Sequence, residues 1–223
     1  QKFISLIITT FFFVITTSAF SDLKFENPCQ KQIKIIENQL DIPAGLLTAI
    51  GKTESGRISE NKNIIIWPWT VNINKKSLFF DTRSQMEKFI NNEIQRKNFN
   101  LDVGCMQINL KWHKNKFKNI LNIVDPMVNV SYATSFLYEL EKKHGSWDKA
   151  IKYYHSSKPE KNTKYYAKVL SFWKSINDKP KRNLILASTN KLEKHIKEFQ
   201  PNLYNELNKI MYFRKIFMEK SKN

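Results

Sequence analysis

Apolar residues recur at intervals of three and four positions through most of the chain, which is the spacing of one buried face on an α-helix. These segments also carry helix boundary signals. Pro43 suits a first helical turn, and Asp125 and Ser146 suit N-caps. Gly145 suits the end of a helix. We predict helices, with Asp81 as the cap of the third, over residues 27–40, 43–54, 81–94, 125–144, 146–154 and 163–176.

One segment favours β-strands instead. Residues 69–80 (WTVNINKKSLFF) contain alternating apolar and polar side chains around a polar stretch at 74–76. We predict a hairpin that turns near this stretch, and no other strand. The expected fold class is therefore mainly α, with a small hairpin.

The first 21 residues have the composition of a secretory signal peptide. Lys2 precedes an apolar run that ends in small residues, among them Thr17, Ser18, Ala19 and Ser21. We expect cleavage after Ala19 or Ser21, and an uncleaved membrane anchor of about 18 residues is the alternative. The sequence thus predicts an exported, periplasmic protein.

The two cysteines, Cys29 and Cys105, take their meaning from this predicted export. An oxidising compartment allows a lone pair to bridge, so we predict a disulfide between them, with two buried free thiols as the alternative. On the chain-entropy model, a disulfide that closes so long a loop would contribute roughly 4–5 kcal/mol to stability.

Basic residues exceed acidic ones by a wide margin. The chain has 37 Lys and Arg against 20 Asp and Glu, a formal net charge of +17. Such an excess favours anionic partners: nucleic acid, a membrane surface or an acidic polymer. Export argues against nucleic acid, so no nucleic-acid partner is expected.

Residues 178–223 form a separate, Lys-rich segment in which apolar residues, such as Leu192 and Ile196, keep helical spacing. We predict a basic, helical C-terminal extension. Two interpretations stay open: a solvated helix that packs on the core, and a helix that binds a membrane surface or a partner. Membrane contact is otherwise expected only through an uncleaved signal peptide.

Glu54 lies at the end of an apolar helical segment. It follows Ile50 by four positions and Leu47 by seven, so the helix turns it toward the buried face. Apolar surroundings raise the pKa of a carboxyl group and allow it to act as a general acid near neutral pH. A salt-bridged, structural Glu is the alternative.

Four motifs around and after Glu54 are similar to those of the soluble lytic transglycosylase domain family. They are GKTESGR at 51–57, WPWT at 67–70, DVGCMQIN at 102–109 and YYHSS at 153–157. The resemblance covers residues 29–176 and implies a lysozyme-like fold for a domain at 27–177. It also implies cleavage of the β-1,4 bond between N-acetylmuramic acid and N-acetylglucosamine in peptidoglycan.

The resemblance assigns roles to the residues that match. Glu54 would be the catalytic acid/base, and Ser55 beside it a positioning hydroxyl. Gly104, Met106 and Gln107 match the family's Gly-Leu-Met-Gln motif. In that motif Gln107 would hydrogen-bond sugar, and Gly104 would allow a close backbone approach.

The remaining matches are aromatic or substituted. Cys105 stands where the family has Leu, which suits the disulfide. Tyr154 matches the Tyr of the family's Ala-Tyr-Asn element, and His155 replaces its Asn, as in a Tyr-His-Ser variant with Tyr165 as a downstream aromatic. We expect His155 to donate a hydrogen bond rather than to act as a base.

Three tryptophans offer flat faces on which a sugar could stack: Trp67, Trp69 and Trp112. Ordinary core or rim packing is an equally good interpretation of each. Trp69, within the WPWT motif, is included among the expected substrate-binding residues.

The family's chemistry needs one carboxylate, whereas most glycosidases use two. The glutamic acid first protonates the glycosidic oxygen. As a carboxylate it then takes the proton of the muramic C6 hydroxyl, which closes a 1,6-anhydro ring. No metal or cofactor is implied, and Asp102, the nearest second carboxylate, is expected to have a loop role.

Two alternatives to a lytic transglycosylase stay open. One is a hydrolytic muramidase of goose-lysozyme type, and the other is a catalytically silent peptidoglycan-binding module. The expected partners are the glycan strands of peptidoglycan. The motif variants also resemble stand-alone exported enzymes found near a secretion or conjugation apparatus.

Overall fold

The computed structural model describes residues 26–177. The predicted signal peptide (1–21) and the predicted C-terminal extension (178–223) lie outside the described residues, so both stay predictions. Within the described part, no helix is both long and apolar enough to cross a membrane.

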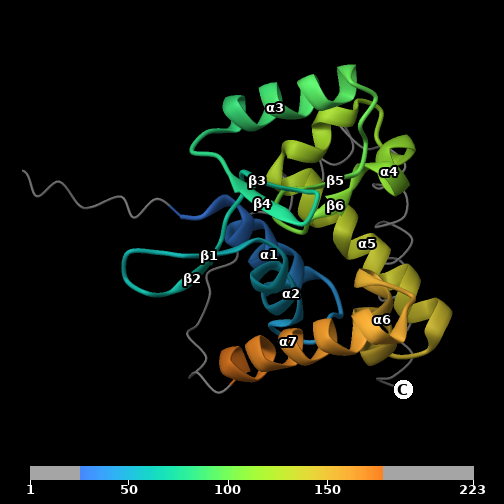
Figure 1. Cartoon of the computed structure of the whole chain (residues 1–223). Helices are drawn as coiled ribbons and strands as arrows, with labels where there is room; N and C mark the ends of the chain where they lie inside the picture. The colour runs from blue at the N-terminus through green and yellow to red at the C-terminus, as the bar shows by residue number, and fades with distance from the viewer. Residues whose placement is uncertain (1–25, 178–223) are drawn as a thin grey trace, which may run out of the picture.

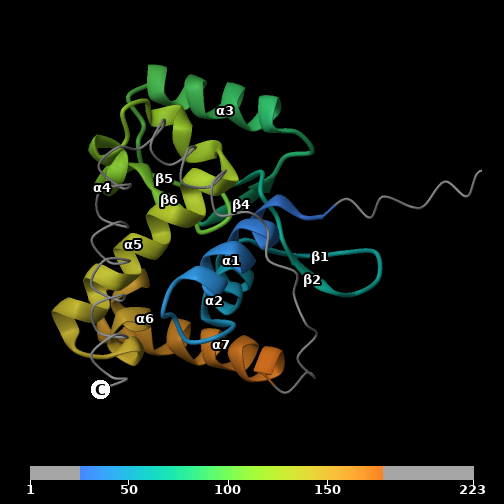
Figure 2. The ribbon, with the colours of Figure 1, turned by 180° about the vertical axis from the view of Figure 1, so that it is seen from behind.

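Seven α-helices account for most of the described chain. Helix α5 connects the two ends of the fold. At one end lie α3, α4 and a small sheet, and at the other lie α6 and α7 (Figure 1). The view from behind shows α1 and α2 between these ends, with α7 beside α2 (Figure 2). The helices are α1 (Pro28–Gln39), α2 (Leu46–Ser55), α3 (Arg83–Gln95), α4 (Leu110–His113), α5 (Pro126–His144), α6 (Trp147–His155) and α7 (Pro159–Asn177).

The six predicted helices are present, but three begin at other residues than expected. Helix α2 begins at Leu46 rather than Pro43, because Gly45 before it has the left-handed conformation (φ 79°). Helix α3 is capped by Thr82 rather than Asp81, in a reciprocal capping box with Gln85. Helix α7 begins at Pro159, four residues before the predicted start, since proline suits a first turn.

The predicted hairpin of residues 69–80 is confirmed as β3 (Thr70–Ile73) and β4 (Lys76–Phe79). Asn74 and Lys75 between them both have positive φ, as a tight two-residue turn between twisted strands requires. The prediction of no other strand was wrong. Four short strands were missed: β1 (Gly56–Ile58) pairs with β2 (Ile64–Ile66), and β5 (Leu101–Val103) pairs with β3 and with β6 (Ile108–Asn109). With two or three residues each, they are too short to show alternation.

The core fixes α2 against three other elements. Its residues Leu46, Leu47 and Ile50 are fully buried, and the helix packs against α1, β2 and α7. Because Gly45 has no side chain to cap α2, Glu37 of α1 takes this part: its Oε1 accepts a hydrogen bond from the Thr48 main-chain nitrogen at 3.2 Å. The first turn of α2 is therefore tied to α1.

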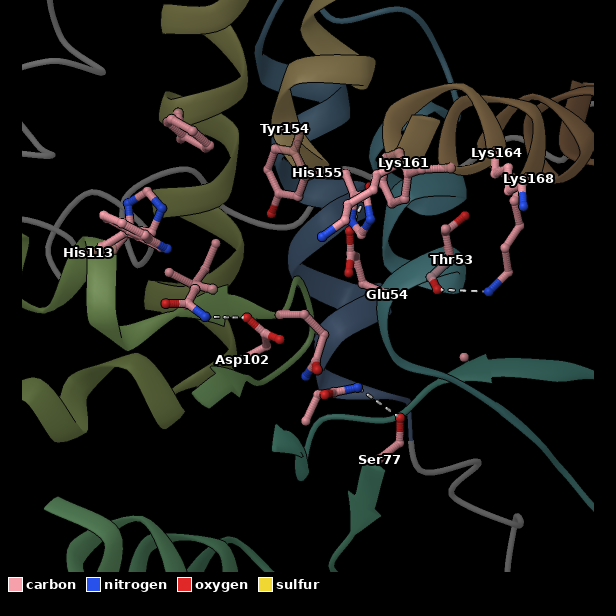
Figure 3. A pocket seen from close by; sticks show the side chains of 18 of the residues that line it. Thr53, Glu54, Ser77, Asp102, His113, Tyr154, His155, Lys161, Lys164 and Lys168 are labelled. Carbon is pink, nitrogen blue, oxygen red and sulfur yellow. Dashed lines mark hydrogen bonds between the residues drawn. The ribbon is translucent and has the colours of Figure 1, made fainter. Parts of the chain in front are cut away.

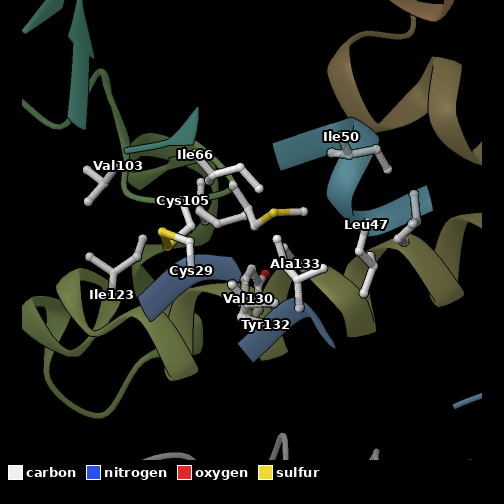
Figure 4. Packing of buried hydrophobic residues seen from close by; sticks show 14 of the residues in the cluster. Cys29, Leu47, Ile50, Ile66, Val103, Cys105, Ile123, Val130, Tyr132 and Ala133 are labelled. Carbon is white, nitrogen blue, oxygen red and sulfur yellow. A yellow bond between two sulfur atoms is a disulfide. The ribbon is translucent and has the colours of Figure 1, made fainter. Parts of the chain in front are cut away.

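The predicted disulfide between Cys29 and Cys105 is confirmed. Both cysteines are buried, and the bond lies near Val103 and Ile123 in the hydrophobic cluster (Figure 4). It joins the first turn of α1 to the loop between β5 and β6. The chain thereby gains a covalent link between two segments that are distant in sequence.

Asn129 of α5 holds the same loop from its other side. Its Oδ1 accepts from the Met106 main-chain nitrogen at 2.8 Å, and its Nδ2 donates to the Val103 carbonyl at 2.8 Å. Gly104 has φ +80°, and a Cβ atom there would lie 2.6 Å from Asn129 Nδ2. Both the backbone conformation and the lack of space therefore require glycine at this position.

We predict that Gly104→Ala lowers the free energy of unfolding by at least about 2 kcal/mol more than Gly145→Ala. Both glycines have positive φ, but nothing lies within 4 Å of a Cβ at Gly145. The difference therefore reports the displacement of Asn129, whose hydrogen bonds are buried. Denaturant unfolding of both variants measures it, and equal losses would contradict this account of the loop.

Candidate active site

A cavity of about 910 Å³ opens between the sheet and the helices α2, α6 and α7 (Figure 3). Its volume lies in the range of small-molecule sites. Glu54 at the end of α2 lines it, together with Gln107, Tyr154, His155 and Tyr165. Five of the residues predicted from the sequence thus meet at one place, although they come from four separate segments.

The carboxyl group of Glu54 is held by one hydrogen bond from α7. The Tyr165 hydroxyl donates to Glu54 Oε1 at 2.6 Å, which leaves Oε2 as the oxygen that carries a proton. Burial raises the pKa of Glu54 from 4.5 to about 8, and Asp102 nearby adds to this. The Tyr165 hydrogen bond and the Lys168 ammonium act in the opposite direction. Glu54 is therefore mostly protonated at neutral pH.

The four-stranded sheet presents one row of polar side chains to the cavity. The register places Ser77 opposite Asn72, Asn72 opposite Asp102, and Asp102 opposite Asn109. All four side chains line the cavity. Asn109 Nδ2 donates to Asp102 Oδ1 at 2.8 Å, and Asn72 Nδ2 donates to Ser77 Oγ at 3.4 Å. The row can offer several hydrogen bonds to one elongated ligand.

Asp102 lies in this row. The expectation from the sequence, that Asp102 has a loop role, was therefore wrong about its position. It belongs to β5 and lines the same cavity as Glu54. Burial raises its pKa, and the hydrogen bond from Asn109 partly offsets that effect. The cavity therefore holds two carboxyl groups.

Gln107 can offer a ligand only its side-chain oxygen. Its Nε2 donates to the main-chain oxygens of Gly104 (2.9 Å) and Thr70 (3.2 Å), and carbonyls accept but do not donate. The Tyr154 hydroxyl likewise donates to a main-chain oxygen, that of Met106, at 2.8 Å. Both side chains support the loop as well as lining the cavity.

His155 stacks on the ring that holds Glu54. The His155 and Tyr165 rings are almost parallel, with centroids 4.5 Å apart. Burial and the charge of Lys161 lower the pKa of His155, which favours the neutral ring at neutral pH. The side chain thus covers one face of Tyr165 without adding charge beside Glu54.

Four other predicted site residues do not line the cavity. The Ser55 hydroxyl is buried and donates to the Cys105 main-chain oxygen at 2.7 Å, so it fastens the end of α2 to the loop. Gly104 allows that loop its turn, and the Met106 side chain is fully buried. Trp69 packs against the core.

The cavity also includes residues that the sequence analysis did not select. Asn72 and Asn109 face the cavity because of the strand register. The feature of the sequence that could have indicated them is a polar residue next to an apolar one, in NIN at 72–74 and QIN at 107–109. The cavity is also lined by Lys161, Lys164 and Lys168 of α7. Their spacing of three and four residues could have indicated that they share one face of a helix. Further lining residues are Thr53, Gly56, Phe79, Ile108, His113 and Phe136.

Two aromatic side chains lie at this cavity with a large exposed surface. Trp112 is 72% exposed and Phe79 is 40% exposed. Exposed rings beside a polar row can stack on the apolar face of a sugar. Within residues 26–177, no group of three or more His, Cys, Asp or Glu side chains is placed to hold a metal ion.

Comparison with known families agrees with the geometry. A family model described as the transglycosylase SLT domain matches residues 31–176. Neither a curated protein nor a solved structure matches the chain. The family match spans α2, the sheet and α7, and thus every residue that lines the cavity. Because it covers well over half of the sequence, the chain belongs to the transglycosylase SLT domain family.

Proposed function

We propose that the protein is a lytic transglycosylase that cleaves the β-1,4 bond between N-acetylmuramic acid and N-acetylglucosamine in peptidoglycan. One observation carries the proposal: Glu54, with its pKa raised to about 8, lines a cavity together with a row of polar side chains that can hydrogen-bond a glycan strand. The family to which the chain belongs gives the substrate class.

In this mechanism protonated Glu54 acts first as a general acid. Its proton goes to the glycosidic oxygen that leaves with N-acetylglucosamine, and the bond from that oxygen to muramic C1 breaks. The Glu54 carboxylate then accepts the proton of the muramic C6 hydroxyl while this oxygen bonds to C1. The 1,6-anhydro ring closes, and Glu54 is again protonated for the next cycle.

The Tyr165 hydroxyl keeps Glu54 in place through both steps. As a donor to Oε1 it orients the carboxyl group, and it also stabilises the carboxylate that exists between the two proton transfers. The amides of the sheet row and the oxygen of Gln107 would bind sugar hydroxyl and acetamido groups. Trp112 would stack on a sugar ring.

A second candidate function follows from Asp102. A hydrolytic muramidase needs a base that activates water, and Asp102 lines the same cavity as Glu54. The two candidates differ in their products, because hydrolysis adds water and ring closure does not.

We further propose that the enzyme acts in the periplasm after export. The signal-like residues 1–21 and the substrate class support this location. The excess of basic residues suits an acidic polymer such as peptidoglycan. The same location and the motif variants also suit an enzyme that acts beside a secretion or conjugation apparatus.

We expect Glu54→Gln to reduce the rate of peptidoglycan digestion at least about 100-fold, because the amide cannot supply a proton. The fold should persist, since Gln has nearly the shape of protonated Glu. Glu60→Gln, at an exposed residue away from the cavity, is the matched control. Release of soluble muropeptides from purified sacculi measures activity, and near-wild-type release by the folded Glu54 variant would refute the assignment.

The activity should depend on pH through Glu54. Because the acid form is required, kcat/KM should fall as the pH rises through about 8, the pKa of Glu54. Tyr165 stabilises the carboxylate and so lowers this pKa; Tyr165→Phe should therefore move the alkaline limb to higher pH. A pH profile of both proteins tests this, and a limb that moves to lower pH would contradict it.

Products distinguish the two candidate reactions. The C6 hydroxyl is tethered to the reacting sugar, and its high effective concentration favours ring closure over attack by water. We expect 1,6-anhydromuropeptides, each about 18 Da lighter than the hydrolysed counterpart. Mass spectra dominated by reducing-end muropeptides would establish the hydrolase instead, with Asp102 as its base.

A further inference from the structure

Three lysines of α7 form a basic wall on one side of the cavity. Lys161, Lys164 and Lys168 follow one another at intervals of three and four residues, so they share one face of the helix. All three line the cavity, and Figure 3 shows Lys161 extending from α7 toward His155 and Glu54, with Lys164 beside Lys168. We call this set the α7 lysine wall.

The innermost lysine of the wall has a structural partner. Lys168 Nζ donates to the Thr53 main-chain oxygen at 3.1 Å, which ties α7 to the last turn of α2. Its charge also lowers the pKa of Glu54. Lys168 therefore belongs to the surroundings of the catalytic acid.

Lys161 and Lys164 have no such partner. The ion pairs of residues 26–177 join other side chains: Lys34 with Glu26, Arg83 with Glu87 and Asp125, and Arg96 with Glu93. No carboxylate within that range neutralises these two ammonium groups. Both line the cavity, and among the described residues that line it, carboxyl groups are carried by Glu54 and Asp102.

The two sides of the cavity therefore differ in charge. The sheet side offers the amides of Asn72 and Asn109 and the hydroxyl of Ser77, which suit neutral sugar groups. It also carries the Asp102 carboxyl group and no basic side chain among the lining residues that the structure describes. The helix side offers two positive charges that no carboxylate of residues 26–177 neutralises. A ligand that fills the whole cavity should be neutral along one edge and anionic along the other.

We propose that Lys161 and Lys164 bind a carboxylate carried by muramic acid, so that the enzyme prefers charged glycan strands over neutral ones. This inference rests on the proposed function. N-acetylglucosamine is neutral, whereas muramic acid bears a lactyl group. That group is linked to a stem peptide with free carboxylates, or is itself a carboxylate where the peptide has been removed.

Binding to three defined ligands tests the proposal. The full-length Glu54→Gln protein serves as background, so that no ligand is cleaved. The ligands are chitotetraose, which is neutral, a peptidoglycan tetrasaccharide with its stem peptides, and the same tetrasaccharide after amidase has removed them. Calorimetry at pH 7 and low salt gives each Kd.

We expect Lys161→Gln with Lys164→Gln to weaken binding of the muramic ligands about fivefold relative to chitotetraose. Lys149→Gln with Lys174→Gln is the control, because it removes the same charge at exposed lysines of α6 and α7 outside the cavity. The control should keep the ratio of affinities. Added salt should reduce the wild-type preference, since exposed charges are screened.

The three ligands also identify the source of the carboxylate. A loss confined to the peptide-bearing ligand supports the stem-peptide carboxylates, and a loss confined to the amidase-treated ligand supports the lactyl carboxylate. A loss for both muramic ligands supports a site that accepts either carboxylate. An unchanged ratio, or an equal loss for chitotetraose, would overturn the proposal. Failure of the proposed chemistry would instead appear as reducing-end products of the wild type, and these leave the ratio of affinities unaffected.

Discussion

The hydrogen bond between Tyr165 and Glu54 joins two residues that lie 111 positions apart, and the rest of the site is arranged around it. A carboxyl group in apolar surroundings loses hydration in its charged form, so it stays protonated unless partners compensate. Tyr165 and Lys168 compensate in part, while burial and Asp102 oppose them. The outcome is an acid whose pKa lies close to neutral pH.

This balance requires α2 and α7 to keep a fixed relation. Their packing brings Tyr165 to Glu54 and Lys168 to the Thr53 carbonyl. The loop between β5 and β6 is fixed to the same frame by the disulfide, by Asn129 and by the Ser55 hydroxyl. Residues that look functional in sequence motifs thus divide into two groups: some line the cavity, and others hold the loop beside it.

The sequence predicted the helices well, because apolar periodicity and caps are local signals that survive in the fold. Asp125, Ser146 and Gly145 cap helices as expected. Strands β1, β2, β5 and β6 could not be predicted in this way, since their pairing depends on residues distant in the chain.

The same limit applied to the site. Glu54 could be proposed from its helical register and its motif, and Gln107 and Tyr154 from theirs. Asn72 and Asn109 became visible only when the sheet register placed them beside Asp102. Ser55 illustrates a related limit: Glu54 beside it in sequence lines the cavity, while the Ser55 hydroxyl donates to the Cys105 carbonyl.

The position of Asp102 bears on both candidate reactions through charge. An ionised Asp102 raises the pKa of Glu54 and so keeps the acid protonated, which assists the first proton transfer whichever nucleophile follows. Asn109 donates to its Oδ1, and its other oxygen keeps lone pairs with which an ionised Asp102 could accept a proton from water. Its own raised pKa shows that its charged form is disfavoured by burial. The geometry therefore gives Asp102 an electrostatic effect on Glu54 that is the same for both proposed reactions.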